Sequence, residues 1–125
     1  MPTILCVDDD EKLLELYSAL LERQGYLVLT ARNGPDGIAL ARQKPVDTIV
    51  LDFNLPGMNG ADVAQLLSVE LPNVPVVIWS GSLELLPESL RWFADAILHK
   101  GDGPETLVRT IECLLKKSPL AAPAK

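Results

Sequence analysis

The chain has few cysteines and no long apolar run, and each shortage excludes a class of protein. Its two cysteines, Cys6 and Cys113, lie far apart, which argues against a disulfide scaffold and against a zinc site. We expect both to be free thiols in a reducing cytoplasm. Uncharged apolar stretches such as residues 74–79 are far shorter than the roughly 20 residues that a membrane-spanning helix requires. The sequence therefore predicts a cytoplasmic protein that does not span a membrane.

The chain is also short of positive charge. Eleven Lys and Arg residues face seventeen Asp and Glu residues, which gives a formal net charge of −6. A chain of this charge, without a stripe of basic residues, is poorly suited to bind DNA or RNA by itself. Most carboxylates are scattered along helix-like segments, but residues 8–11 (DDDE) form one acidic run that needs an explanation.

Two hydrophobic patterns alternate along the chain. Its 125 residues, 48% hydrophobic and 22% charged, fit one domain with one core. Apolar or β-branched runs predict strands at residues 3–7, 27–31, 48–51, 76–79 and 96–99. Apolar residues at helical spacing lie between these runs and after the last one. We predict five strands and five helices, the fourth helix (residues 83–93) being short or mobile because Pro87 lies in its first turn.

This alternation predicts an α/β fold. Strands that alternate with helices form right-handed crossovers and a parallel sheet covered on both faces. Five strands favour the order 2-1-3-4-5, the flavodoxin-like doubly wound arrangement. We assign residues 1–117 to this domain, and residues 118–125, which are rich in Pro and Ala, to a tail or the start of a linker.

Polar residues stand at the ends of four predicted strands. The carboxyl ends of parallel strands share one edge of the sheet, so we expect a common rim for these residues: Asp8, Asp9, Asp52, Ser80 and Lys100. Clustered carboxylates repel one another unless a cation compensates, and a shallow site of oxygen ligands suits Mg²⁺. With Lys100 as a second positive charge, the rim is suited to accept a phosphoryl group on an aspartate.

Four segments, at these strand ends, follow one another in the order of a known family's motifs. They are residues 4–10 (ILCVDDD), 52–60 (DFNLPGMNG), 75–81 (PVVIWSG) and 94–100 (ADAILHK). Together they resemble the response-regulator receiver domain of two-component signalling, over residues 3–117. The resemblance implies a switch that is phosphorylated by the histidine of a sensor kinase or phosphotransfer protein.

The resemblance also implies a role for each residue of the rim. Asp52 is then the phosphoacceptor, while Asp8, Asp9, Asp52 and the backbone carbonyl of Asn54 hold Mg²⁺. Ser80 and Lys100 bind the oxygens of the phosphoryl group. The domain assists its own phosphorylation and dephosphorylation and is not an enzyme that acts on separate substrates. The signal passes to a surface formed by the fourth helix, the fifth strand and the fifth helix, through which a homodimer can form. The resemblance does not identify the output partner.

Two residues depart from the family pattern. Ile97 lies three residues before Lys100, where the family usually has an aromatic side chain that couples the site to the output surface. Gly101 follows Lys100 where the family tends to have proline, often after a cis bond, so we expect a trans or a strained bond and a more flexible loop. These departures motivate an alternative, a receiver-fold interaction module with altered or absent phosphorylation-dependent switching.

Other residues have plainer interpretations. We expect Asp10 to be a helix cap or a solvent-facing acid, His99 to be structural or solvent-facing, and Trp79 to be part of the core. A flavin carrier is not favoured, because no Gly-rich or Ser/Thr-rich phosphate loop follows the first strand and the acidic run would repel a flavin phosphate. A small phosphohydrolase is not favoured either, because little chain is left for a substrate pocket.

Overall fold

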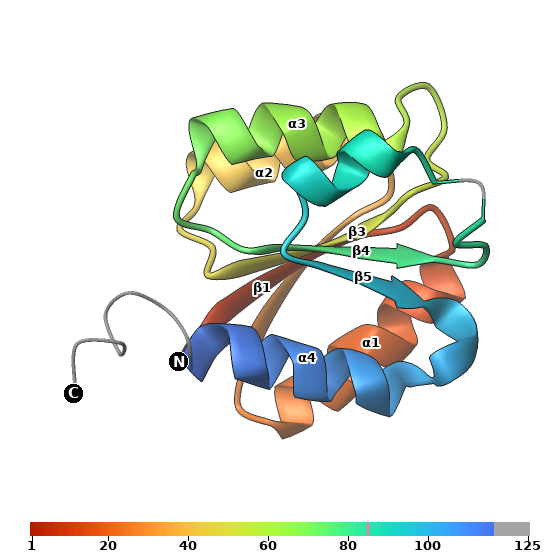
Figure 1. Cartoon of the computed structure of the whole chain (residues 1–125). Helices are drawn as coiled ribbons and strands as arrows, with labels where there is room; N and C mark the ends of the chain where they lie inside the picture. The colour runs from red at the N-terminus through yellow and green to blue at the C-terminus, as the bar shows by residue number, and fades with distance from the viewer. Residues whose placement is uncertain (85, 117–125) are drawn as a thin grey trace, which may run out of the picture.

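The structure is a computed structural model that describes residues 1–84 and 86–116 (Figure 1). The predicted tail, residues 118–125, lies outside the described residues. The elements in chain order are β1 (Thr3–Val7), α1 (Glu11–Arg23), β2 (Leu27–Ala31), α2 (Gly34–Gln43), β3 (Thr48–Asp52), α3 (Gly60–Glu70), β4 (Val76–Ser80), the 3₁₀ turn η1 (Glu88–Trp92), β5 (Ala96–His99), the 3₁₀ turn η2 (Lys100–Asp102) and α4 (Pro104–Lys116). No helix of the described part is long and apolar enough to cross a membrane.

The five strands form one parallel sheet in the order β2-β1-β3-β4-β5, which confirms the predicted topology. The strands begin and end close to where the apolar runs do. β3 and β4 each extend one residue further than predicted, because Asp52 pairs with Trp79 and Ser80 pairs with His99. The polar residues that follow the apolar runs are therefore held by the sheet itself.

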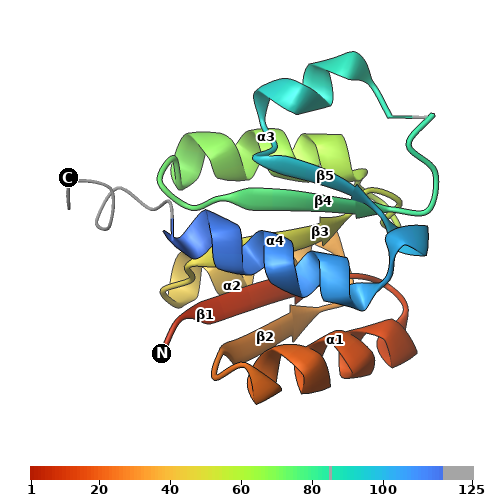
Figure 2. The ribbon, with the colours of Figure 1, turned by 60° about the horizontal axis from the view of Figure 1, so that its bottom comes forward.

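Helices cover both faces of the sheet (Figures 1 and 2). On one face, Leu14, Tyr17 and Leu21 of α1 and Leu107 and Ile111 of α4 pack against strand residues that include Cys6, Val50 and Trp79. On the other face, α2 and α3 pack against the alternate strand residues, among them Leu5, Ile49 and Ile78. Burial on both faces explains why the three inner strands, β1, β3 and β4, are apolar almost throughout.

Side-chain caps set where three helices begin. Asp10 accepts hydrogen bonds from the backbone N–H groups of Lys12 and Leu13, at 3.0 and 3.3 Å. Asn33 and Asn59 cap α2 and α3 in the same way. These bonds satisfy N–H groups that have no partner within the helix. Asp10 is thus a helix cap, as predicted.

The predicted count of five helices is wrong for the described residues, which contain four α-helices. In place of the fourth helix, residues 88–92 form only the 3₁₀ turn η1 on the α3 side of the sheet (Figure 2). Pro87 precedes this turn with extended backbone and accepts the N–H of Leu90, an i to i+3 bond. Proline has no N–H and disfavours a helical residue before it, so the segment is too short for an α-helix. The prediction of a short element here is confirmed.

The two cysteines lie in contrasting places. Cys6 points into the core from β1 and is 1% exposed, whereas Cys113 is exposed on α4. Burial, with a smaller contribution from the charge of Asp8, raises the pKa of the Cys6 thiol to about 12.

Candidate functional site

Three aspartates meet at the carboxyl ends of β1 and β3. Asp8 follows β1 directly and Asp52 is the last residue of β3, and both are almost fully buried, while Asp9 is exposed. Carboxylate oxygens of the three residues all lie within 4.8 Å of one another. The adjacent pairing of β1 with β3 brings the groups together, as the predicted strand order requires.

Lys100 brings one positive charge to this cluster from the far edge of the sheet. It follows β5 directly, and its Nζ donates to Asp8 Oδ2 at 3.1 Å and lies 3.4 Å from Asp52 Oδ2. One ammonium group therefore lies between two buried carboxylates, and the third carboxylate, on Asp9, faces solvent.

The buried carboxylate of Asp52 is strongly perturbed by its surroundings. Burial, followed by the negative charge of Asp8, raises its pKa from 3.8 to about 6, although Lys100 and the N–H of Asn54 act in the opposite direction. Burial acts to lower the pKa of Lys100, but the charges of Asp52 and Asp8 outweigh it, so the net change is upward. The cluster therefore has excess negative charge and favours a further cation.

The loop after β3 is built to hold Asp52. The N–H of Asn54 donates to Asp52 Oδ1 at 3.2 Å, and Gly57 has a φ of 78°, in the region that favours glycine. Gly60 closes the loop by donating its N–H to the carbonyl of Phe53 at 2.7 Å. A Cβ on Gly60 would lie 2.6 Å from Phe53 Cα, so this close approach requires glycine.

Ser80 is fully buried at the end of β4, but its hydroxyl is turned to its own loop. Its Oγ donates to the carbonyl of Ser82 at 3.1 Å and accepts the N–H of Ser82 at 3.2 Å. Of the rim residues named from the sequence, the structure thus gathers Asp8, Asp9, Asp52 and Lys100, whereas the Ser80 hydroxyl bonds to backbone groups.

Comparison with known proteins decides the family. The family model described as response regulator receiver domain matches residues 4–112. The chain belongs to this family. Receiver domains belong to response regulators that histidine kinases phosphorylate on aspartate, so the function predicted from the sequence is confirmed at this level.

Relatives of this receiver domain differ in length. It is 36% identical over 119 residues to the protein PilH of Pseudomonas aeruginosa, covering 92% of this chain and 98% of PilH. It is 42% identical over 118 residues to the probable transcriptional regulatory protein TcrX of Mycobacterium tuberculosis, covering 93% of this chain but 50% of TcrX. The chain thus spans nearly all of one relative and half of the other.

Solved receiver structures agree with the fold. A CheY-like receiver domain protein from Methanospirillum hungatei superposes with a TM-score of 0.88 at 29% identity, covering 94% of this chain and 96% of that one. TrrA of Thermotoga maritima, in a complex with the histidine kinase ThkA, gives a TM-score of 0.84 at 26% identity, covering 92% of this chain and 99% of that one.

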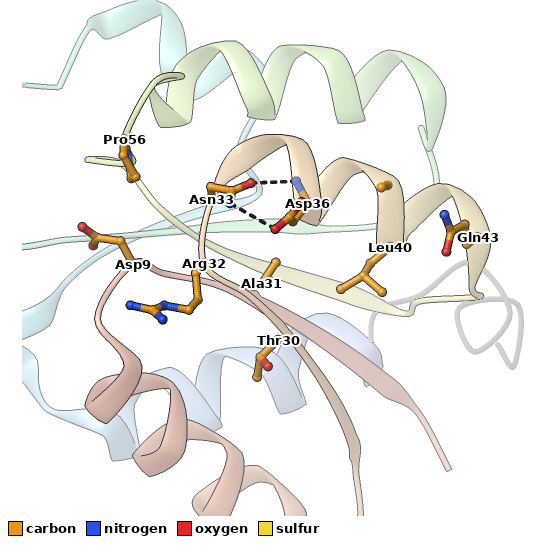
Figure 3. A pocket seen from close by; sticks show the side chains of 10 residues that line it. Asp9, Thr30, Ala31, Arg32, Asn33, Asp36, Leu40, Gln43 and Pro56 are labelled. Atoms are coloured by element: carbon orange, nitrogen blue, oxygen red, sulfur yellow. Dashed lines mark hydrogen bonds between the residues drawn. The ribbon is translucent and has the colours of Figure 1, made fainter.

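An open groove leads away from the acidic cluster of this receiver domain. It has a volume of about 890 Å³ and runs from Asp9 and Pro56 along β2 and α2 to Gln43. Figure 3 shows Arg32 beside Asp9 at one end of this groove, and the two bonds between Asn33 and Asp36 at the start of α2. Asp9 is thus the member of the cluster that an approaching molecule meets first.

A buried aromatic pair beside the receiver site was not predicted from the sequence. The indole Nε1–H of Trp79 donates to the hydroxyl of Tyr17 at 2.5 Å, and the rings meet edge to face with centroids 6.0 Å apart. Trp79 is the strand partner of Asp52, and the charges of Lys100, Asp8 and Asp52 all act on the Tyr17 hydroxyl. Burial is the main cause that raises the pKa of Tyr17. The sequence places Trp79 in the core, but a contact between residues 62 positions apart has no local signal.

Proposed function

We propose that this receiver domain is a phosphorylation-controlled signalling switch in which Asp52 accepts the phosphoryl group. The observation that supports this assignment is the position of Asp52: a buried carboxylate, 3.4 Å from the Lys100 ammonium, at the end of a central strand. An Oδ atom of Asp52 forms a bond to phosphorus while the bond between phosphorus and the donor histidine nitrogen breaks. The electron pair of the broken bond stays on that nitrogen, and the ring leaves as a neutral imidazole because its other nitrogen carries a proton taken from solvent. Water later attacks phosphorus and regenerates the carboxylate and free phosphate.

The donor atoms of the acidic cluster fit a magnesium ion. Carboxylate oxygens are hard ligands, and Asp8, Asp9 and Asp52 bring theirs within 4.8 Å of one another. These three residues and the backbone carbonyl of Asn54 would hold the ion. When bound, Mg²⁺ offsets the negative charge that the phosphoryl oxygens bring to the site.

The side chains around Asp52 complete the proposed chemistry. Lys100 can keep its contact with Asp8 while its ammonium pairs with a phosphoryl oxygen near Asp52. Ser80 must exchange the carbonyl of Ser82 for a phosphoryl oxygen, which breaks the bond that its hydroxyl donates to its own loop. The domain therefore assists its own phosphorylation and dephosphorylation and acts on no separate substrate.

The proposed phosphoryl donor is the histidine of a sensor kinase or a phosphotransfer protein. The receiver TrrA, similar to this chain, has been solved in complex with a histidine kinase. We also propose a cytoplasmic location, in keeping with the two free cysteines. An output partner, or a second copy of the chain, would dock on η1, β5 and α4, and residues 1–117 would make up the receiver unit.

Intact mass after incubation with acetyl phosphate tests the proposal. With Mg²⁺ the native chain should gain one phosphoryl group, and neither the Asp52→Asn variant nor the native chain in chelator should do so. Asp47→Asn is the matched control, because Asp47 lies at the other end of β3. No gain by the native chain, under conditions where Mg²⁺ binding is verified by calorimetry, would refute the assignment.

A second candidate is a receiver-fold interaction module in which phosphorylation does not switch the output surface. Ile97 favours it, because this half-buried side chain lines a cavity of about 360 Å³ together with Leu86 and Arg91 and offers no ring or hydroxyl to a partner. Beryllofluoride, a phosphoryl analogue, distinguishes the two functions. Amide resonances of β5 and η1 that shift on its binding support the switch, whereas shifts confined to the acidic cluster support the module.

A further inference from the structure

The turn that carries Lys100 is closed by the side chain of the residue before it. His99 ends β5 with extended backbone, and its Nδ1 accepts the N–H of Gly101 at 2.8 Å. In the sequence, Lys100 stands between His99, which accepts this hydrogen bond, and Gly101, which donates it. The His99 side chain is therefore the N-terminal cap of η2.

Gly101 is required by the imidazole and not by the backbone. Among the described residues, Gly25, Gly57 and Gly103 have a positive φ, and Gly101 does not. A Cβ on Gly101, however, would lie 2.7 Å from both Nδ1 and Cε1 of His99. The missing side chain at position 101 therefore leaves room for the ring to reach the N–H.

The turn is also closed on its far side. The N–H of Gly103 donates to the carbonyl of Lys100 at 3.2 Å, and the hydroxyl of Thr106 donates to the carbonyl of Asp102 at 3.0 Å. No cis peptide bond occurs in the described residues, so the bond between Lys100 and Gly101 is trans. Hydrogen bonds on both sides thus fix the backbone from which the Lys100 side chain extends.

These hydrogen bonds matter because the long side chain of Lys100 has to place its ammonium group at one position between two carboxylates. Its Nζ has to lie between Asp8 Oδ2 and Asp52 Oδ2, at 3.1 and 3.4 Å. Four methylene groups separate Nζ from the backbone, and displacements of about 1 Å at a reacting centre can cost about a hundredfold in rate. We propose that His99 is a positioning residue that, through its bond to Gly101, holds Lys100 in place for phosphoryl transfer to Asp52; this rests on the function proposed above.

Two substitutions of His99 separate its bond from its bulk. Leucine fills a similar volume but accepts no hydrogen bond, whereas asparagine can accept the N–H two residues on through its Oδ1. With saturating Mg²⁺ and acetyl phosphate, His99→Leu should take up the phosphoryl group about three to ten times more slowly than the native chain, and His99→Asn within about twofold of it. Calorimetric Mg²⁺ affinity should be unchanged in both variants, because His99 is not among the proposed ligands.

The steric half of the inference has its own test. Gly101→Ala should slow uptake in the native background, because the new Cβ displaces the imidazole. In a His99→Ala background, which already has the slow rate, the same substitution should have no further effect. If the two substitutions slow phosphoryl uptake additively, the claim that Gly101 is there to leave room for the imidazole is overturned.

Hydrogen exchange distinguishes failure of this inference from failure of the proposed function. The Gly101 amide should be protected in the native chain and in His99→Asn, and should exchange faster in His99→Leu, whether or not Asp52 is ever phosphorylated. A native chain that takes up no phosphoryl group refutes the function. A native chain that takes it up at the same rate as a folded His99→Leu variant, or equal Gly101 exchange in all three proteins, refutes the positioning role.

Discussion

Replacement of Asp52 by asparagine should stabilise the metal-free protein at neutral pH. Asparagine has nearly the same shape and keeps an oxygen for the N–H of Asn54, but it removes a negative charge that lies buried beside Asp8. The effect should depend on pH in a direction that the pKa of Asp52 determines.

The sign follows from the raised pKa. Asp52 keeps its proton up to about pH 6 in the folded protein but loses it near pH 3.8 when unfolded. The folded state thus binds more protons between these values, so its stability falls as pH rises through this window. The advantage of Asp52→Asn should be near zero below pH 4, grow from pH 4 to 6 and stay constant above.

The magnitude follows from the same two values. A rise from 3.8 to about 6 corresponds to about 3 kcal/mol at about 1.36 kcal/mol per pKa unit. Lys100, the nearest cation to Asp52, is 23% exposed and Asp9 faces solvent, so screening and rearrangement reduce this figure. We expect the free energy of unfolding to rise by about 1 to 2 kcal/mol in the variant at pH 7.

Urea unfolding in the presence of a chelator, at fixed ionic strength from pH 4 to pH 8, measures this difference. Glu15→Gln, on the exposed side of α1, is the matched loss of one carboxylate and should leave the pH dependence unchanged. Equal stability of Asp52→Asn and the native chain at pH 8 would refute the reasoning, since it would mean that Lys100 fully offsets burial. An advantage that is already present at pH 4 would refute it as well.

Three further predictions concern the surroundings of this carboxylate. Tyr17→Phe leaves the buried N–H of Trp79 without its acceptor and should lower the free energy of unfolding by about 1 to 3 kcal/mol. Trp79→Phe should lower the free energy of unfolding by less in the Tyr17→Phe variant than in the native chain. Gly60→Ala forces a Cβ against the backbone of Phe53, so urea unfolding should show a loss of about 1 to 3 kcal/mol and calorimetry a weaker Mg²⁺ affinity. Mg²⁺ at a hundred times its dissociation constant should raise the unfolding free energy by about 2.7 kcal/mol, reversibly by chelator. An equal gain at the same Mg²⁺ concentration in Asp9→Asn would contradict the metal assignment.

The sheet was predictable from the sequence because its signals are local. Each strand is a short apolar run bounded by turn residues, and Asn33 and Asn59 mark helix starts by side-chain chemistry alone. Parallel pairing then places the ends of β1, β3 and β5 on one rim, so the meeting of Asp8, Asp52 and Lys100 follows from topology without knowledge of any side-chain conformation.

The features that escaped prediction depend on side-chain conformation or on competing local geometry. The sequence predicts a fourth helix that is short or mobile because of Pro87, and the structure has only the 3₁₀ turn η1, at residues 88–92. The sequence placed Ser80 on the rim and could not show that its hydroxyl bonds to Ser82. In the same way, the sequence predicts that His99 is structural or solvent-facing, but its bond to Gly101 depends on one orientation of the imidazole.

The contrast between the two thiols makes it possible to measure how often the sheet opens. Cys6 lies two residues before Asp8 in a central strand and is buried, so a thiol reagent cannot reach it while β1 stays paired, and burial also raises the pKa of this thiol to about 12. Cys113 is exposed on α4 and offers the same reagent an immediate target. The rate at which Cys6 is alkylated therefore reports how often β1, the strand that leads into the acidic cluster, opens. Ligands that bind the acidic cluster should slow this alkylation.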